Sequence, residues 1–372
     1  MPTLEIRGIP AILLAFTVAL IITWYYIPKV IRVVRQRHLE DKPEFHKIHR
    51  NAVPTLGGIG IFAGFLIGFF IGIDGYMPDL SYFAAAALFL FFVGIKDDLV
   101  HLQPYKKLAG EIASALLIFF FTSVRFSHLH GFLGATDISL TTSFFITIPV
   151  ILIIINAFNL IDGIDGLASS VGIVATVTFG LYFYFSGDFA YTVMAASLLG
   201  ALIAFLRFNM SDGPNKIFMG DTGSLVIGFT MAVFAIRFNE LDANGMAFIN
   251  LKSAPSVSIA ILIIPLYDTL RVIILRLWYR RNLFTADNRH LHHLMLRAGF
   301  SHRWATTIIS FFNIFLIAVG YSLDSIGIFP LGVVLLSLCI LATFILNRAV
   351  KKRETMAIPV AVNSQAQEMT VL

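Results

Sequence analysis

Amide and carboxylate side chains recur at helical spacing at the end of one apolar segment of the chain. Asn156, Asn159 and Asp162 stand three residues apart, which places them about 60° apart around a helix and on one side of it. Their oxygens are of the type that binds a hard cation or sugar hydroxyls. The alternative is hydrogen bonding between helices, which explains one asparagine better than three polar residues on one face.

An aspartate pair stands at the end of another apolar segment. Asp97 and Asp98 are adjacent, and two carboxylates near an apolar core repel each other and are costly to desolvate. They therefore indicate a compensating cation, a metal ion or phosphate chemistry. The alternative is a solvated helix end, with Lys96, Lys106 and Lys107 as ion-pair partners.

Asp221 stands in a Gly-Asp-Thr-Gly-Ser motif, 220–224, that opens a further apolar segment. If a helix begins there, its free N–H groups and partial positive charge favour phosphate, and the carboxylate of Asp221 could hold a divalent cation. The alternative is a capping role, since Asp, Thr and Ser all cap helices.

Basic residues supply candidate phosphate ligands. Arg289 precedes three histidines, His290, His292 and His293, and this group indicates a phosphate or a zinc site. Zinc sites usually combine nitrogen and sulfur ligands, and the one cysteine, Cys339, lies in an apolar segment, so a diphosphate fits better. A basic loop lying on anionic lipid headgroups is the alternative.

A second basic motif comes earlier in the chain. Lys47 and His49 stand before a Pro-x-x-Gly-Gly motif that ends at Gly57 and Gly58. The basic side chains could bind phosphate, and the glycines would let the backbone approach a ligand closely. The alternative is a basic membrane anchor followed by a turn and close helix packing.

The elements that must position these motifs are predicted to be membrane helices. Of the 372 residues, 58% are hydrophobic and 13% are charged, whereas a soluble domain has about 45–50% and about 25%. This composition excludes a soluble enzyme, a disordered chain and a disulfide-rich scaffold. A membrane span needs about 20 mostly apolar residues. We count eleven such segments: 8–28, 55–73, 80–95, 108–124, 142–160, 166–186, 189–206, 222–238, 256–276, 304–323 and 326–347.

Lysine and arginine are concentrated on one side of these segments. Of 27 such residues, 22 follow odd-numbered spans and 4 lie on the opposite side. Because cytoplasmic loops carry the positive excess, we expect the N-terminus outside and the C-terminus in the cytoplasm. The distribution of positive charge thus accounts for the net charge of +5 by the orientation of the chain in the membrane. We therefore expect no nucleic-acid partner. The prediction is an all-α integral membrane protein with a single domain over 1–350 and a disordered cytoplasmic tail over 351–372.

The polar motifs nearly all fall at the cytoplasmic ends of the spans. A secondary transporter of a nucleotide sugar or lipid-linked sugar, the alternative from another class, is expected to place ionisable groups near mid-membrane. A lipid-binding scaffold would not need Asp221 or the Asn/Asp face. One pair inside the ninth span, Asp268 and Arg271, has the spacing of an i,i+3 ion pair. The residues therefore predict a membrane enzyme of phosphate chemistry.

Taken together, the motifs resemble the polyprenyl-phosphate N-acetylhexosamine-1-phosphate transferases, glycosyltransferase family 4. The resemblance rests on KIH–x₄–PxxGG, NxxNxxDGxxGL, FMGDTGS and HLHH, in this order between about Lys47 and Arg303. The histidine motif and the LMLRAGF after it are similar to the WecA/TagO-like branch, which transfers N-acetylglucosamine 1-phosphate from UDP-GlcNAc to undecaprenyl phosphate and releases UMP. MraY-like phospho-MurNAc-pentapeptide transferases, the alternative within the family, end the histidine motif differently. The family's DDxxD motif here has His101 as its last residue.

The resemblance implies a Mg²⁺ ion, with Mn²⁺ as an alternative, held by Asn159 and Asp221. It implies catalytic carboxylates at Asp97, Asp98 and Asp162. It also implies substrate contacts from Lys47, His49, Asn156, Arg289, His290, His292 and His293. The expected partners are a UDP-N-acetylhexosamine and undecaprenyl phosphate, and a homodimer is left open. The expected location is the bacterial inner membrane, with the site on the cytoplasmic face.

Overall fold

The computed structural model describes residues 8–37, 53–73, 78–131, 137–280 and 290–369. Every named element in these ranges is a helix, as the composition predicts, and one isolated antiparallel bridge joins His128 to Asp137. The elements are α1 Gly8–Gln36, α2 Gly57–Gly72, α3 Pro78–Val100, α4 Pro104–Phe121, α5 Leu140–Ile161, α6 Leu167–Phe185, α7 Phe189–Asn209, α8 Gly220–Ala243, α9 Ala254–Ile261, α10 Ile263–Trp278, α11 Leu291–Ala298, α12 His302–Ser322, the short 3₁₀ helix η2 Asp324–Ile326 and α13 Ile328–Met369.

Each of the eleven predicted segments contains a helix, although the ends differ. By length and apolar composition, seven of the described helices could cross a membrane, or eight if α9 and α10 form one crossing. The protein is therefore a helical membrane protein. The count of eleven crossings and the direction of the termini stay predictions.

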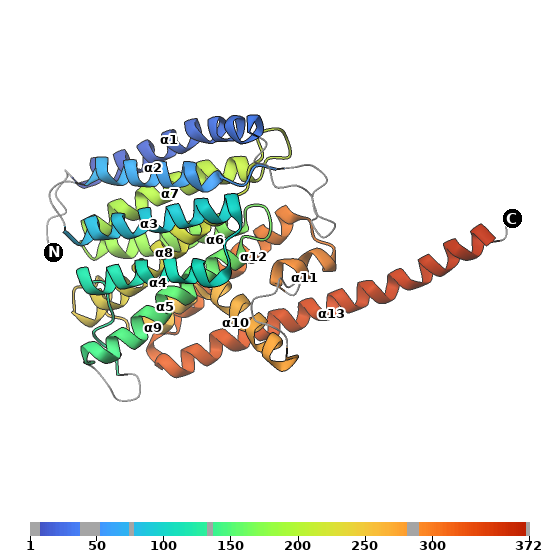
Figure 1. Cartoon of the computed structure of the whole chain (residues 1–372). Coiled ribbons are helices and arrows are strands. Elements are labelled where there is room, and N and C mark those ends of the chain that lie inside the picture. The colour runs from blue at the N-terminus through green and yellow to red at the C-terminus, as the bar shows by residue number, and fades with distance from the viewer. Residues whose placement is uncertain (1–7, 38–52, 74–77, 132–136, 281–289, 370–372) are drawn as a thin grey trace.

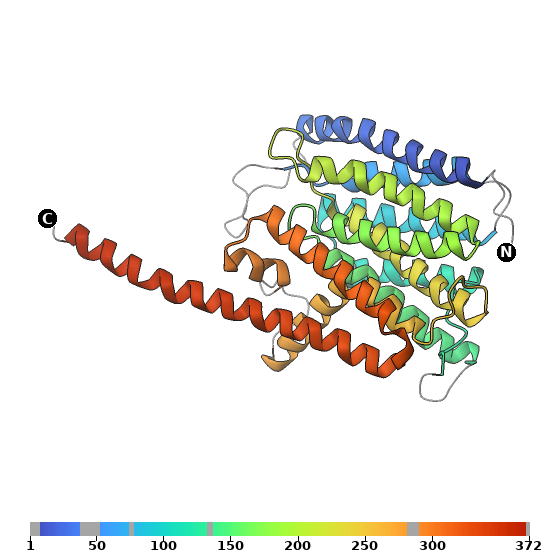
Figure 2. The ribbon, with the colours of Figure 1, turned by 180° about the vertical axis from the view of Figure 1, so that it is seen from behind.

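The helix α8 lies at the centre of the bundle. Side chains on all its faces are buried between Thr222 and Leu241, and it packs against α2, α3, α5, α6 and α9. Neighbouring helices cover it in views from both sides (Figures 1 and 2). A helix that is apolar all round belongs in such a core. Its first residues are therefore held at a fixed place near the ends of α3 and α5.

Glycines bring α2 into close contact with α1 and α7. A Cβ at Gly64 would lie 2.0 Å from Oγ1 of Thr23, and one at Gly68 would lie 2.6 Å from the backbone oxygen of Ala15. Small residues let membrane helices pack this closely. The three helices form one side of the bundle, at the top of Figure 1.

The ninth predicted segment is broken into α9 and α10, which meet at Leu262 with a bend of 83°. Pro265 has no N–H, so the carbonyl oxygen of Ile261 loses the donor that an unbroken helix would supply. Asn313 of α12 replaces it: its Nδ2 donates to the backbone oxygens of Ile261 and Ala260 at 3.3 and 3.4 Å. The break turns α10 aside and brings it to the start of α11.

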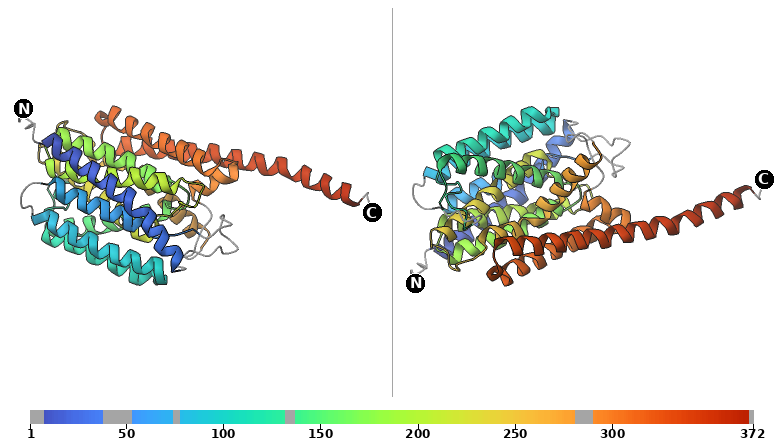
Figure 3. Two further views of the ribbon diagram at one scale, coloured as in Figure 1. Left: turned by 90° about the horizontal axis from the view of Figure 1, so that it is seen from above. Right: turned by 90° about the horizontal axis from the view of Figure 1, so that it is seen from below.

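The last helix, α13, extends well beyond the bundle (Figures 1 and 3). It continues to Met369, so the structure differs from the disordered tail predicted for 351–372: the backbone is helical over 351–369. Extending an existing helix fixes one residue for each hydrogen bond gained, whereas starting a helix is unfavourable. Since α13 begins in the last apolar segment, the polar residues after it extend a helix that already exists.

Candidate active site

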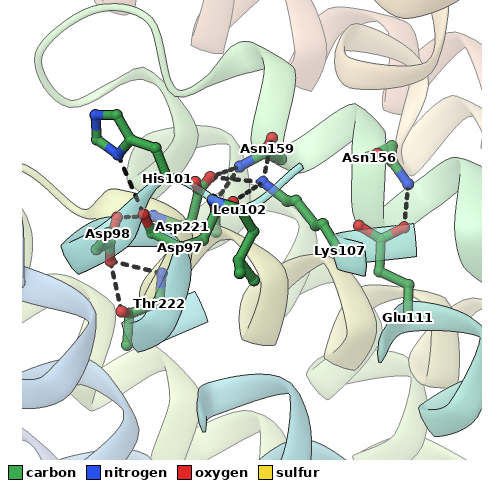
Figure 4. A network of polar contacts seen from close by, with 11 residues as sticks. Asp97, Asp98, His101, Leu102, Lys107, Glu111, Asn156, Asn159, Asp221 and Thr222 are labelled. Atoms are coloured by element: carbon green, nitrogen blue, oxygen red, sulfur yellow. Dashed lines mark hydrogen bonds and ion pairs between the residues drawn. The ribbon is translucent and has the colours of Figure 1, made fainter. Parts of the chain in front are cut away.

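Asp98, near the end of α3, caps the N-terminus of α8. Its Oδ1 accepts the N–H of Asp221 at 2.8 Å, and its Oδ2 accepts the N–H and the hydroxyl of Thr222 at 3.0 and 2.5 Å. A carboxylate here satisfies free N–H groups of the first turn and lies at the positive end of the helix dipole. Asp98 therefore fixes the backbone that carries Asp221 (Figure 4).

The glycines before α2 bring the backbone of that helix against α8. Gly57 and Gly58 donate their N–H groups to the carbonyl oxygens of residues 218–219 at 3.0 and 2.8 Å. A Cβ at Gly58 would lie 2.1 Å from the backbone nitrogen of Gly223. The closest approach of these glycines is thus to another part of the chain. Of the two interpretations of this motif, close packing is the one that the structure shows.

Lys107, at the start of α4, is the centre of a polar network. Its Nζ lies 3.1 Å from Oδ2 of Asp97 and 2.9 Å from Oδ1 of Asp221, and it donates to Oδ1 of Asn159 at 3.2 Å. Asn159 in turn donates to Asp221 and, at 2.9 Å, to Ser224. These partners come from α3, α5 and α8. Three motifs of the sequence therefore meet at one cation (Figure 4).

Asp97 and Asp98 have different partners although they are adjacent. Asp97 is 7% exposed, and its Oδ1 accepts the N–H of Leu102 at 2.7 Å while Oδ2 faces Lys107. Successive residues of a helix point about 100° apart, so the pair divides between two tasks. His101 has a left-handed backbone, with φ 50°, and its Nδ1 lies 3.3 Å from the backbone oxygen of Asp97. The last position of the acidic motif thus contacts the backbone of Asp97.

Glu111 holds the side chain of Asn156. It lies one turn after Lys107 and is 1% exposed. Its Oε2 accepts from Nδ2 of Asn156 at 2.5 Å, and the same Nδ2 donates to the backbone oxygen of Leu152 at 2.9 Å. The amide nitrogen of Asn156 is therefore used within the protein. Asn156, predicted to contact substrate, has its Oδ1 left for that role.

Asp162 ends α5 and lies close to the other carboxylates. Burial, together with the negative charges of Asp221, Asp98 and Asp165, raises its pKa well above the ordinary value for an aspartate. A carboxylate with this environment favours its protonated form. The influence of these carboxylates on its pKa puts Asp162 near the polar network, and its catalytic role stays a prediction.

Asp165, three residues on, ties the turn between α5 and α6 to its surroundings. Its Oδ2 lies 2.6 Å from Nζ of Lys216 and 3.2 Å from Nδ1 of His302. Burial alone would raise the pKa of Asp165, but the hydrogen bonds from His302 and Lys216 outweigh it and hold the pKa below its ordinary value. Thr306 of α12 also donates to the backbone oxygen of Asp165 at 2.8 Å. This turn is therefore held by α12 and by the segment before α8.

The predicted histidines lie at the start of α11. His290 and His292 are 5% and 2% exposed, and His293 is partly buried. The ring of His292 occupies the space beside Gly163, where a Cβ would lie 2.2 Å from its Nε2. Burial, with the neighbouring His293 and His290, lowers the pKa of His292 to about 2. A neutral His292 therefore packs α11 against the turn after Asp162.

Three predicted phosphate ligands, Lys47, His49 and Arg289, lie outside the described residues. Their roles stay predictions.

The oxygens around Lys107 suit a hard cation. Asp97, Asn159 and Asp221 each direct one oxygen at the ammonium group. Carboxylate and amide oxygens are ligands that Mg²⁺ and Mn²⁺ take. Among the described residues, no group of three or more His, Cys, Asp or Glu side chains could hold a metal ion, so a complete set would include the amide of Asn159. The residues present fit a Mg²⁺ ion where Lys107 now supplies positive charge.

Lys107 and Glu111 are the functional candidates that sequence reasoning missed. The sequence suggested Lys107 only as one of three possible ion-pair partners of Asp97 and Asp98. One signal could have found them: Glu111 is a carboxylate inside an apolar span, where ionisable residues are rare and paired. It stands four residues after Lys107, on the same face of the helix.

The fold and the site define a helical membrane protein with a cation-centred polar network. The family model described as glycosyl transferase family 4 matches residues 80–239, which include this network. The chain is 30% identical, over 84% of each chain, to the undecaprenyl-phosphate alpha-N-acetylglucosaminyl 1-phosphate transferase of Salmonella typhi. It is 29% identical to the protein of that name from Escherichia coli (strain K12), over 86% of each chain. It is 27% identical to the probable undecaprenyl-phosphate N-acetylglucosaminyl 1-phosphate transferase of Bacillus subtilis (strain 168), over 85% of this chain and 84% of the relative. The chain belongs to glycosyl transferase family 4.

Proposed function

We propose that this protein transfers N-acetylglucosamine 1-phosphate from UDP-GlcNAc to undecaprenyl phosphate and releases UMP. One observation carries the proposal: Asp97, Asn159 and Asp221, from three separate motifs, meet at the single cation Lys107. The names of the relatives, undecaprenyl-phosphate N-acetylglucosaminyl 1-phosphate transferases, support it.

In this reaction a phosphate oxygen of the lipid attacks the β-phosphorus of UDP-GlcNAc. A P–O–P bond forms to the lipid phosphate, and the bond from the β-phosphorus to the bridging oxygen breaks, with its electron pair leaving on UMP. A phosphate monoester has a second pKa near 6, so the nucleophile is already largely dianionic at neutral pH. The site therefore needs charge shielding and alignment more than a strong base.

The network around Lys107 provides this shielding. Mg²⁺ bound by Asn159 and Asp221 would neutralise charge that develops on the UMP leaving group. Lys107 is held by Asp97 on its other side, and its ammonium group can pair with a phosphate oxygen as a point charge. Asp97 thereby orients the cation that faces the lipid phosphate, and a covalent aspartyl-phosphate on Asp97 is not required.

The remaining residues have supporting roles in the proposal. Asp98 holds the start of α8, so that Asp221 keeps its position. Asn156 and Asp162 lie on the side of the uridine and the sugar. The diphosphate and lipid phosphate contacts fall to Lys47, His49, Arg289, His290 and His293, while the neutral His292 packs the histidine helix in place.

We place the enzyme in the bacterial inner membrane, with its site on the cytoplasmic face. The support is the distribution of Lys and Arg along the chain. This orientation, with eleven crossings and the N-terminus outside, lets the soluble nucleotide sugar enter from the cytoplasm and the lipid enter from the bilayer.

The test is an assay of the purified protein with Mg²⁺, undecaprenyl phosphate and a panel of UDP-sugars, in which UMP release is measured. We expect UMP with UDP-GlcNAc, only when the lipid is present. If UMP is released with UDP-MurNAc-pentapeptide and with no other donor of the panel, the protein is instead a phospho-MurNAc-pentapeptide transferase. Uptake of nucleotide sugar into proteoliposomes without UMP release would indicate a transporter. Size-exclusion chromatography of the same sample separates a monomer from a homodimer.

A further inference from the structure

Asp268 is a buried carboxylate of α10 with two strong partners on another element. It is 2% exposed. Its Oδ2 lies 2.9 Å from Nδ1 of His290, and its Oδ1 accepts the N–H of Leu291 at 2.8 Å. Arg271, the partner that the sequence spacing predicts, lies farther away, with 3.9 Å between its NH1 atom and Oδ1 of Asp268. A buried carboxylate is costly unless it is well hydrogen-bonded, and here most of that bonding comes from the histidine segment.

The contact between Asp268 and the N–H of Leu291 caps a helix. Leu291 begins α11, and the residue before it, His290, gives that helix no side-chain cap. The first turn of α11 also has no acidic side chain of its own. Asp268 supplies the missing acceptor from a neighbouring helix. It therefore fixes where α11 starts.

The contact between Asp268 and Nδ1 of His290 determines how the ring of His290 can meet a ligand. Because Nδ1 faces a carboxylate, which only accepts, that nitrogen carries the proton. The ring then meets any ligand through Nε2, as an acceptor when neutral and as a donor when protonated. A carboxylate that orients a histidine in this way governs its tautomer and its angle.

The orientation of His290 reaches the polar network through its neighbours. Its ring stacks on that of His292 with 5.6 Å between centroids, and His292 lies 4.3 Å from the ring of His293. His292 in turn fills the space beside Gly163, the residue after Asp162. A tilt of the first ring would therefore disturb the whole histidine group and the turn after α5.

We propose that Asp268 is a positioning residue for phosphoryl transfer: it holds the proton of His290 on Nδ1 and presents Nε2 to the diphosphate of the donor. The break between α9 and α10 serves this arrangement, because it turns α10 aside and brings Asp268 to the start of α11. The inference rests on the proposed function for the diphosphate, but the Asp268–His290 relation can be measured without it.

The chain offers a matched control. Asp242, near the other end of α8 from Asp221, accepts the N–H of Leu251 at 2.8 Å and lies 3.4 Å from Nδ1 of His130. Its side chain is 7% exposed. Asp242 thus has partners of the same two kinds as Asp268, a backbone N–H and a histidine Nδ1, but it lies away from the polar network. Asp242→Asn therefore reports what loss of such a carboxylate does to stability alone.

The experiment compares Asp268→Asn with Asp242→Asn in the full chain. An amide that turns its NH₂ toward Nδ1 forces the proton of a neutral His290 onto Nε2, with little change in volume. We expect Asp268→Asn to lower kcat with UDP-GlcNAc by roughly 10–100-fold, the usual effect of removing such a supporting carboxylate. The KM for undecaprenyl phosphate should change by less than about threefold, and Asp242→Asn should leave kcat within about twofold.

A double-mutant cycle separates positioning from folding. In a His290→Ala background, Asp268→Asn should cost less than about twofold, because the ring through which Asp268 acts is gone. An equal loss in both backgrounds would overturn the proposal and leave Asp268 only a helix cap.

Nitrogen-15 NMR of histidine-labelled protein gives a readout that does not depend on activity, with His290 assigned from the spectrum of His290→Asn. The wild-type ring should carry its proton on Nδ1, and a neutral wild-type ring protonated on Nε2 would overturn the proposal even if Asp268→Asn fails to fold. If no UDP-sugar gives UMP, the proposed function fails while this measurement still decides the Asp268–His290 relation.

Discussion

Oδ2 of Asp98 accepts two hydrogen bonds from Thr222, one from its N–H at 3.0 Å and one from its hydroxyl at 2.5 Å. This contact joins the end of α3 to the start of α8 across 124 residues of sequence. The position of Asp221 therefore depends on the carboxylate of Asp98, which contacts the backbone N–H of Asp221. The acidic pair thus contains one residue facing Lys107 and one that builds the support.

Asp98→Ala should therefore lower both stability and turnover. Loss of a cap costs about 1–2 kcal/mol, which corresponds to a fall of about 1–3 °C in Tm for a chain of 372 residues. UMP release should fall at least tenfold, because Asp221 is no longer held. Thr222→Val, which removes only the hydroxyl bond, should have a smaller effect on both. A loss of activity with an unchanged Tm would instead indicate that Asp98 contacts substrate directly.

Asp221→Asn should abolish UMP release while the protein still folds and inserts. The carboxylate of Asp221 lies 2.9 Å from the cation at the centre of the network, and it would supply much of the protein's charge to a Mg²⁺ that keeps several waters. We expect a loss of at least about 100-fold. Asp212→Asn is the control, since that side chain is 80% exposed and pairs with Arg303 at the surface. Near-normal Mg²⁺-dependent activity of Asp221→Asn would place the metal ligand elsewhere.

Lys107→Gln should separate turnover from metal requirement. Lys107 and a metal ion would draw on the same oxygens of Asn159 and Asp221, so removal of the ammonium group should lower the Mg²⁺ concentration needed for half-maximal activity. The kcat should nevertheless fall, by about tenfold or more, because a phosphate partner is lost. The measurement is a Mg²⁺ titration of UMP release, with the neighbouring exposed Lys106→Gln as control. An unchanged Mg²⁺ requirement would argue against shared oxygens.

Direct transfer predicts that no UMP appears without lipid. If Asp97 or Asp98 were a nucleophile, the enzyme alone would release about one UMP per active site in a burst. Asp98 is occupied by three hydrogen bonds from α8, and Asp97 faces Lys107, so we expect no burst. Asp97→Asn should keep a small residual rate, because the lipid dianion remains. A lipid-independent burst that disappears in Asp97→Asn would establish the two-step route.

Acid should destabilise the protein through His292. Its pKa is about 2 in the folded state against about 6.5 when unfolded, so below pH 6.5 the unfolded chain binds a proton that the folded chain does not. The stability that the neutral ring contributes is complete above pH 6.5 and falls by about 1.4 kcal/mol for each pH unit below it. The Tm difference between wild type and His292→Gln should therefore shrink from pH 7.5 to pH 5. A Tm difference that stays constant over this pH range would show that the ring does not titrate this way.

Hydropathy and helical spacing predicted where the helices lie and which polar residues of α3, α5 and α8 come together in one network. They did not predict the break before Ile263, because apolar composition is the same on both sides of it. The missing N–H of Pro265 was visible, but its replacement by Asn313 depends on a contact 52 residues away.

The division of the acidic pair was also hidden. Asp97 and Asp98 are adjacent in the sequence, which suggests a shared role, whereas neighbouring side chains on a helix point in different directions. Lys107 has partners 52 and 114 positions along the chain, and no spacing rule connects them. The residues that the sequence pointed to lie in short local motifs, whereas Lys107 and Glu111 lie in no such motif and were revealed by their contacts with other helices.

The contact between Asp98 and the start of α8 also bears on how the protein is made. The two ends of this contact are 123 residues apart, and at about 5–20 residues per second a ribosome needs about 6–25 seconds to synthesise that length. During this interval α3 and α4 have been synthesised, but neither Asp98 nor Lys107 has its partner on α8. A nascent chain that has not yet reached Gly220 therefore leaves an ammonium group and two carboxylates without that helix, and the polar network cannot assemble until α8 has been synthesised.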